Sequence, residues 1–269
     1  MFEKIGAQTF PLNQCQFIVV DNGSPEVPKQ DDLPDFVTLL VCDTPGSYSA
    51  RNMGVRHANG ELLIFTDADC LPNPDWIESH WKAYKKNGVH TINAGGVVVK
   101  KLTPGAPNNY ELYDSFLGIP QERYATKRGY AVTANLAVPR AVFDIAGCFD
   151  EKRFSGGDAE FCQRALRFGA RLSFVRDAVV FHPARATWKE LEIKARRVKG
   201  GQICNGPFSR RASFLFKSLL YPFISIVRVV RSPLRTEDKK RILGVVLKLS
   251  AVEVSETFNL LTGKQPERR

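Results

Sequence analysis

The feature that most constrains this chain is the alternation of short apolar segments with amphipathic ones over residues 1–184. Apolar and β-branched residues predict strands over residues 16–20, 36–42, 61–66, 91–101 and 171–181. Helices are predicted over residues 47–58, 75–86 and 158–168, and residues 104–129 are expected to be irregular. Strands that alternate with helices favour a mainly parallel sheet with helices on both faces, whose ligands bind at the carboxyl ends of the strands.

The second organising feature is a change of pattern and charge near residue 184. Residues 1–184 contain 19 Lys+Arg and 21 Asp+Glu, which leaves 19 and 7 of the totals of 38 and 28 for residues 185–269. The net charges are therefore −2 and +12. Long helices with little strand signal follow residue 184. The sequence thus predicts an α/β domain over 1–184 and a basic, amphipathic helical region over 185–269.

The pattern of the basic region indicates its partner. Residues 214–230 are its most apolar segment, but Lys217, Pro222 and Arg228 interrupt it, so a membrane span is not expected. Basic residues that flank apolar helices are typical of a helix lying on an anionic membrane surface. The alternative is a helical subdomain that packs on the front domain. Few aromatic residues are interleaved with Arg and Lys and no known nucleic-acid motif occurs, so we expect no nucleic-acid partner.

The cysteines and the N-terminus indicate the compartment. Six cysteines lie far apart without a CxxC pair, which argues against a disulfide scaffold and a zinc ribbon. The first residues show no basic-then-apolar signal pattern. We therefore expect a cytoplasmic protein that is peripheral on the inner face of the cell membrane.

Two carboxylates follow the predicted strand over 61–66. Asp67 and Asp69 are two residues apart, so both side chains point to one side at the carboxyl end of that strand. Two hard oxygen ligands at this place suit Mg²⁺ or Mn²⁺ bridging a diphosphate. The alternative is a solvated turn, because a lone DxD motif is common in loops.

Two further residues could bind an anionic, nucleotide-type ligand. Asp21 follows the predicted strand over 16–20, and its alternative role is an Asx-turn that shapes the loop. Arg51 lies in the first turns of the helix expected after Gly46, where the free N–H groups of the helix N-terminus favour a phosphate. A surface arginine that only solvates the helix is the competing interpretation.

The segment 154–161 contains a glycine pair followed by an acidic helix start. Asp158 is a candidate general base for an attacking hydroxyl, or else a simple helix cap. Glu160 is a candidate for binding the same acceptor, and Arg164 for holding the loop by an ion pair. His182 ends the last predicted strand and would be structural unless it faces Asp69.

Five stretches together resemble one protein family. They are AQTFP, FIVVDNGS, ARNMGVRHANGELLIFTDADCLPNPDWI, TANLAVPRAVFDIAGCFDE and SGGDAEFCQRALRFGARL. Their order and spacing, from about Ala7 to His182, are similar to those of family 2 glycosyltransferases of the GT-A fold. The resemblance implies an α/β, Rossmann-like mixed sheet and inverting transfer of a sugar from a nucleotide-sugar donor to a hydroxyl acceptor. With the basic region, it suggests surface polysaccharide or glycolipid synthesis on a lipid-linked acceptor.

The resemblance also implies residue roles. Asp21 would contact the nucleotide base or ribose, and Arg51 would lie near the donor phosphate. Asp67 and Asp69 would hold the sugar-nucleotide and its divalent metal, with His182 completing the metal site. Asp158 would be the catalytic base.

Two departures from the family pattern leave an alternative open. Family members often show Glu-Asp where this chain has Gly157 and Asp158. The family's first strand, normally interior to the sheet, has no counterpart before the helix in which Met1 begins. The alternative to an active enzyme is therefore a catalytically impaired or fragmentary GT-A-like binding protein.

Overall fold

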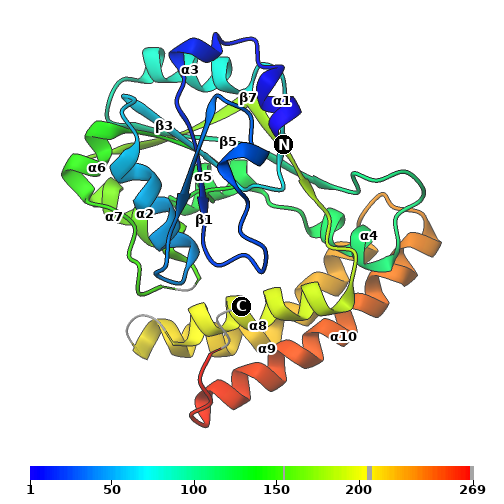
Figure 1. Ribbon diagram of the computed structural model, residues 1–269. Helices are drawn as coiled ribbons and strands as arrows, with labels where there is room; N and C mark the ends of the chain where they lie inside the picture. The colour runs from blue at the N-terminus through cyan, green and yellow to red at the C-terminus, as the bar shows by residue number, and fades with distance from the viewer. Residues whose placement is uncertain (154, 205–207, 267–269) are drawn as a thin grey trace. The chain divides into compact units, whose positions relative to one another are not determined.

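The computed structural model describes residues 1–153, 155–204 and 208–266 of the chain (Figure 1). These residues form two compact units. One consists of Met1–Val98 and Ile119–His182, and the other of Val99–Gly118 and Pro183–Arg269. Phe154, the first residue of the segment that leads to Asp158, lies outside the described residues.

The first unit is built on two sheets. Strands β1 (Phe17–Asp21) and β2 (Val37–Val41) pair in parallel, with Phe17 opposite Val37. The larger sheet has the order β3-β6-β5-β7-β4. Its strands are β3 (Leu62–Thr66), β4 (Leu71–Pro72), β5 (Thr91–Lys100), β6 (Asn135–Pro139) and β7 (Arg171–Pro183). All five strands expected from the sequence are confirmed to within two residues at each end.

The larger sheet departs from the expected mainly parallel arrangement. Strand β6 runs antiparallel to both β3 and β5, and β4 runs antiparallel to β7. Strand β6 lies between β3 and β5 in this sheet. The sequence did not reveal β6 because all of its residues are buried and show no alternation, and Pro139 weakens the strand signal.

The three helices that the sequence predicts in the first unit, over 47–58, 75–86 and 158–168, begin and end within one residue of the predicted positions. The helices of this unit are α1 (Phe2–Gly6), α2 (Ser47–His57), α3 (Trp76–Asn87), α5 (Gln121–Arg128), α6 (Arg140–Ala146) and α7 (Gly157–Arg167), with 3₁₀ turns η1 (Leu12–Gln14) and η2 (Gln30–Asp32). Helix α2 packs on β1, α3 on β3 and α6 on β6. Gly46 is the N-cap of α2, and Ser47 is its first helical residue.

The core beneath α6 and α7 is aromatic. Phe143, Phe149 and Phe161 are all buried, and the ring centroids of Phe149 and Phe161 are 4.5 Å apart. Burying each of these side chains contributes about 1.5–3 kcal/mol. This packing fixes α7 against the loop that precedes it, and therefore fixes the residues at the helix N-terminus.

Asn135 organises the buried end of β6. Its Nδ2 donates to the carbonyls of Gly96 and Ala178, at 2.8 and 2.9 Å. Its Oδ1 accepts from Nε1 of Trp76 and lies 2.8 Å from Nε2 of His80. Because that oxygen can only accept, His80 donates from Nε2 and its Nδ1 carries no proton. Among the described residues this buried Nδ1 has no hydrogen-bond partner.

His80 makes the first unit sensitive to acid. Burial lowers the pKa of His80 from 6.5 to about 4. In the unfolded chain this histidine binds a proton as the pH falls through 6.5, whereas in the folded chain it stays neutral down to about pH 4. The free energy of unfolding therefore falls by up to about 3 kcal/mol between pH 6.5 and pH 4. We expect His80→Gln to flatten this acid slope in urea unfolding at stepped pH, and His90→Gln, at an exposed histidine, to leave it unchanged. An equal slope in wild type and His80→Gln would contradict this account.

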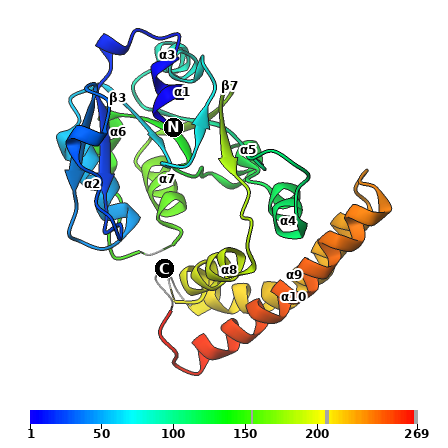
Figure 2. The ribbon, with the colours of Figure 1, turned by 45° about the vertical axis from the view of Figure 1, so that its right-hand side comes forward.

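The second unit is helical. It contains α4 (Asn109–Leu117), α8 (Trp188–Ile203), α9 (Phe208–Val230) and α10 (Thr236–Leu261), and Figure 2 shows the two longest, α9 and α10, alongside each other. Its core joins side chains from all four helices: Tyr113, Leu191, Ala195, Val229, Ile242, Val245, Val246 and Leu249. Pro222 lies inside α9. Within the described residues no helix combines the length and the apolar character needed to cross a membrane.

The expectation that residues 104–129 are irregular is wrong. They contain α4 and α5, and α4 begins with a capping box in which Asn108 accepts from the N–H of Glu111 while the Glu111 carboxylate accepts from the N–H of Asn108. The Asn-x-x-Glu spacing was the signal for this helix. Because Tyr113 of α4 packs among α8 and α10, residues 99–118 group with the C-terminal helices rather than with the α/β unit.

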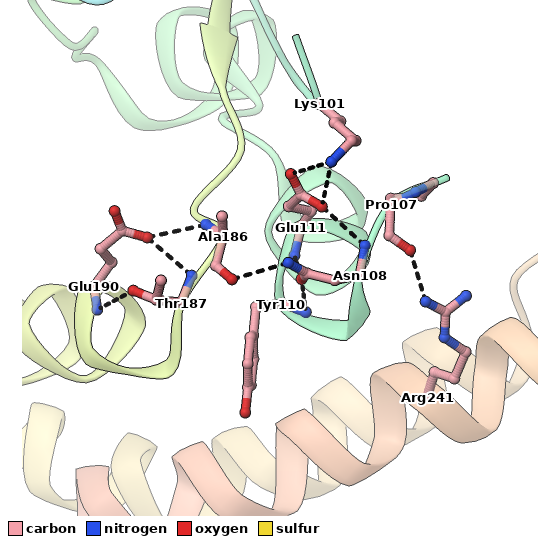
Figure 3. A network of polar contacts seen from close by, with 9 residues as sticks. All are labelled: Lys101, Pro107, Asn108, Tyr110, Glu111, Ala186, Thr187, Glu190 and Arg241. Atoms are coloured by element: carbon pink, nitrogen blue, oxygen red, sulfur yellow. Dashed lines mark hydrogen bonds and ion pairs between the residues drawn. The ribbon is translucent and has the colours of Figure 1, made fainter. Parts of the chain in front are cut away.

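Polar contacts tie the helix starts of the second unit together (Figure 3). Nζ of Lys101 lies 3.0 Å from Oε1 of Glu111, and Asn108 donates to the carbonyl of Ala186 at 2.9 Å. Arg241 of α10 donates to the carbonyl of Pro107 at 2.7 Å. Thr187 and Glu190 form a second capping box at the start of α8. Whether the two units are separate domains stays a prediction.

Candidate active site

The DxD carboxylates lie directly after β3, as predicted. Asp67 is partly buried and Asp69 is exposed. Nη2 of Arg51, on α2, lies 3.1 Å from Oδ1 of Asp67. The structure therefore brings together two of the predicted donor-binding residues, one from α2 and one from the loop after β3.

His182 lies beside the same loop. Strand β4 follows the DxD residues and pairs with β7, with Leu71 opposite Phe181. This register places the next residue, His182, so that its Nε2 is 3.9 Å from Oδ2 of Asp69. The condition under which His182 could be more than structural, that it faces Asp69, is met in the structure.

Asp67, Asp69, Cys70 and His182 offer ligand atoms that all lie within 4.8 Å of one another. Burial, and after it the Asp67 carboxylate, raise the pKa of the Cys70 thiol to about 12. Without a bound ion the thiol is therefore protonated. The remaining donors are two carboxylates and one imidazole, a set that fits Mg²⁺ or Mn²⁺.

Asp158 is held at the start of α7. Its Oδ2 accepts from the N–H of Thr133 at 3.2 Å, and its Oδ1 is buried without a hydrogen-bond partner among the described residues. A fixed carboxylate with one uncommitted oxygen is suited to accept a proton. Glu160 and Arg164, one turn further on, pair with each other at 2.7 Å.

Arg164 also holds the loop before α7. Its guanidinium donates to the carbonyl of Cys148 at 2.7 Å and to the carbonyl of Ala146. Arg164 was predicted to hold the loop by an ion pair, but its ion pair is with Glu160 on the same helix, and it contacts the loop through hydrogen bonds to backbone carbonyls. That Glu160 or Arg164 binds substrate stays a prediction.

Asp21 shapes its own loop. It is buried at the end of β1, and its carboxylate accepts from the N–H groups of Gly23 and Ser24 at 3.1 and 3.3 Å. These bonds form the Asx-turn that the sequence offers as the alternative role of Asp21. The adjacent Asn22 donates to the carbonyl of Thr44 and accepts from the N–H of Gly46, which fixes the start of α2. Contact of Asp21 with a nucleotide stays a prediction.

Tyr48 is a residue of the site that the sequence did not indicate. It lies in the first turn of α2, is 5% exposed, and its ring faces the Arg51 guanidinium at 5.4 Å. A Cβ atom added at Gly157 would lie 2.6 Å from two carbons of the Tyr48 ring. The side chain that family members often carry at this position therefore has no room. No local signal predicts this contact, because the two residues are 109 positions apart.

Comparisons of sequence identify similar proteins. The sequence model of the family described as glycosyl transferase family 2 matches residues 1–144. Glycosyltransferase AglE of Haloferax volcanii is 35% identical over 210 residues, which cover 74% of this chain and 66% of AglE. The pre-mycofactocin glycosyltransferase of Mycobacterium tuberculosis is 29% identical over 66% of this chain and 40% of that protein. The chain thus aligns with two thirds or less of the length of these relatives.

Solved structures share the fold at low sequence identity. The mannosyltransferase PcManGT from Pyrobaculum calidifontis, in complex with GDP-Man and Mn²⁺, has a TM-score of 0.53 and 17% identity over 97% of this chain and 69% of its own. The S. aureus TarS 1–349 structure has a TM-score of 0.52 and 16% identity over 98% of this chain and 70% of its own.

Proposed function

We propose, from the premise that this chain belongs to glycosyl transferase family 2, that it transfers a sugar from a nucleotide-sugar donor to a hydroxyl acceptor with inversion at the anomeric carbon. Its fold is that of the GT-A glycosyltransferases. The observation that carries the proposal is that one unit holds both a cluster of carboxylates and an imidazole and the carboxylate of Asp158, which is held at the start of α7.

The donor side of the reaction is assigned to the loop after β3. Asp67, Asp69 and His182 would hold Mg²⁺ or Mn²⁺, and Mn²⁺ is the ion bound with GDP-Man in PcManGT. When bound, the ion offsets the negative charge that develops on the leaving diphosphate. Arg51, which forms an ion pair with Asp67, would add positive charge next to the donor phosphates. Asp21 would contact the nucleotide base or ribose.

The acceptor side is assigned to the start of α7. The carboxylate of Asp158 takes the proton of the acceptor hydroxyl as the hydroxyl oxygen bonds to the anomeric carbon and the bond from that carbon to the diphosphate oxygen breaks. Attack from the face opposite the nucleotide inverts the configuration. Glu160 is proposed to bind the same acceptor, while Arg164 keeps the loop in place.

The transfer step is tested by the anomeric configuration of the product. The full chain is incubated with labelled UDP-, GDP- or dTDP-sugars and glycolipid acceptors that carry a free sugar hydroxyl, and the new linkage is read by NMR. An inverted linkage supports the proposal, and a retained one contradicts it. Donor binding without any turnover would favour the alternative of a GT-A-like binding protein.

The acceptor is proposed to be lipid-linked because α9 has a second apolar face. Its buried face carries Ser218, Ser225 and Val229. A separate exposed face, repeating every three to four residues, consists of Phe216, Leu220, Phe223, Ile224, Val227 and Val230. We call these six residues the outer face of α9.

The charges around the outer face favour an anionic membrane as its partner. Residues 193–236 contain no Asp or Glu, but they contain ten basic residues: Lys194, Arg196, Arg197, Lys199, Arg210, Arg211, Lys217, Arg228, Arg231 and Arg235. Three of them, Lys194, Arg196 and Lys199 on α8, are paired with acids from other parts of the chain and do not count toward this charge. Lys217 and Arg231 are exposed at the two ends of the outer face. A second copy would bring two positive surfaces together, whereas anionic headgroups attract them. Anionic lipid is enriched in the cytoplasmic leaflet, where we place the protein.

Phe223→Asp should weaken binding of the full chain to vesicles that contain phosphatidylglycerol. The substitution puts a charge in the middle of the outer face, where Phe223 is 67% exposed, and we expect about a tenfold loss of binding in sedimentation. Phe168→Asp is the matched control, because Phe168 is 61% exposed in the other unit. Equal sedimentation of wild type and Phe223→Asp would sink the membrane assignment.

A further inference from the structure

The hydroxyl of Tyr48 lies at the N-terminus of α7, the helix that carries Asp158. The N–H groups of Gly157 and Asp158 donate to Oη of Tyr48, at 2.8 and 3.4 Å. The N-cap residue is Gly156, which has no side chain to accept these bonds. Because the first N–H groups of a helix have no partner within the helix, Tyr48 supplies from α2 the acceptor that a capping side chain would normally provide.

The ring of Tyr48 determines how close α7 can lie. At Gly157 a Cβ would approach the ring carbons to 2.6 Å, which side chains do not tolerate. The tyrosine and the glycine are therefore complementary, and the ring occupies the place next to Asp158 that an acidic residue at 157 would need. On its other side the ring stacks on Phe149, with centroids 5.9 Å apart.

Tyr48 also joins the two halves of the candidate site. The Arg51 guanidinium over its ring is paired with Asp67, and the Tyr48 hydroxyl holds the backbone of Asp158. Burial, and after it the negative charge of Asp158, raise the pKa of Tyr48, so the phenol stays neutral at ordinary pH. The neutral hydroxyl of Tyr48 remains a hydrogen-bond acceptor for α7 at every pH at which the enzyme would be assayed.

We propose that Tyr48 is a positioning residue that acts through Asp158, by fixing the first turn of α7, and this rests on the transferase function proposed above. Without the hydroxyl, the two N–H groups lose their acceptor and the carboxylate of Asp158 loses its fixed place. The ring, its stacking and its contact with Arg51 are kept in Tyr48→Phe, so the donor side is undisturbed.

The test uses Tyr48→Phe in the full chain. We expect kcat for sugar transfer to fall about 10- to 100-fold, the scale of a small misplacement of a reacting group, while the Kd for the donor with Mn²⁺ changes by less than about twofold. In an Asp158→Asn background the same substitution should cause no further loss, because both act on one step. Hydrogen exchange of the Gly157 and Asp158 amides should become faster in Tyr48→Phe.

Tyr84→Phe is the matched control. It removes a hydroxyl that donates to Glu61 at 2.6 Å in the same unit, and it should leave kcat and the two amides unchanged. A fully active Tyr48→Phe, or one with unchanged exchange at Gly157 and Asp158, would overturn the positioning role alone. A wild-type chain that transfers no sugar would overturn both this proposal and the proposed function, so the two failures are distinguishable.

Discussion

Asp158→Asn should reduce sugar transfer by about 10²- to 10⁴-fold, the contribution expected of a positioned general base. The amide has nearly the shape of the carboxylate and its oxygen can still accept from the N–H of Thr133, so the loop should keep its conformation. What is lost is the ability to take a proton. The rate is measured as release of nucleoside diphosphate at saturating donor and acceptor, and donor Kd should stay within about twofold of wild type.

The control for this prediction is another acid on a helix of the same unit. Asp144 is exposed on α6, and Asp144→Asn makes the same chemical change away from the site. It should leave turnover unchanged. Wild-type turnover in Asp158→Asn would remove Asp158 from the reaction, and the start of α7 would then be only a helix end.

Asp69→Asn should have the opposite profile, with metal and donor binding lost together. It removes one of two carboxylates from the cluster with His182, where Oδ2 of Asp69 lies 3.9 Å from Nε2. We expect Mn²⁺ affinity to fall at least about 10- to 100-fold, the effect seen even for groups that only support a ligand. Free Mn²⁺ is measured by electron paramagnetic resonance as protein is added.

Asp75→Asn provides the comparison for Asp69→Asn. Asp75 is an exposed acid six residues further along the chain, and its side chain makes no capping hydrogen bond to α3. Mn²⁺ affinity should be unchanged in this variant. If Asp69→Asn bound Mn²⁺ as tightly as Asp75→Asn, the DxD carboxylates would be a solvated turn rather than a metal site.

The parts of the fold that could be predicted from sequence are those fixed by local patterns. Strand β3 ends at Thr66 and delivers Asp67 as expected, because a run of apolar residues bounded by acids is a local signal. Helices α2, α3 and α7 begin within one residue of their expected starts. The position of the DxD residues at a strand end was therefore accessible before the structure was known.

The parts that could not be predicted depend on contacts between distant residues. Strand β6 is read as a strand only once its neighbours β3 and β5 are known, since it is buried on both faces. The approach of His182 to Asp69 depends on the β4–β7 register. The fit of Tyr48 against Gly157 depends on shape at a single point, for which composition and spacing give no signal.

The sequence leaves two interpretations open for Asp21 and for Arg51. Asp21 is buried and has the hydrogen bonds of the turn interpretation, so its contact with a nucleotide stays a prediction. Arg51 is not a surface arginine that only solvates its helix, since it pairs with Asp67 at 3.1 Å. This ion pair forms because α2 places the guanidinium of Arg51 next to the loop that carries Asp67.

Calorimetric titration of nucleotide-sugars into the full wild-type chain tests the central claim most directly. UDP-, GDP- and dTDP-sugars are each titrated in the presence of Mn²⁺ and again in the presence of EDTA. We expect at least one donor to bind with Mn²⁺ and EDTA to abolish this binding, because Asp67, Asp69 and His182 are proposed to hold the donor through the ion. Binding of none of these donors by the folded chain, or binding of equal strength with EDTA, would contradict it.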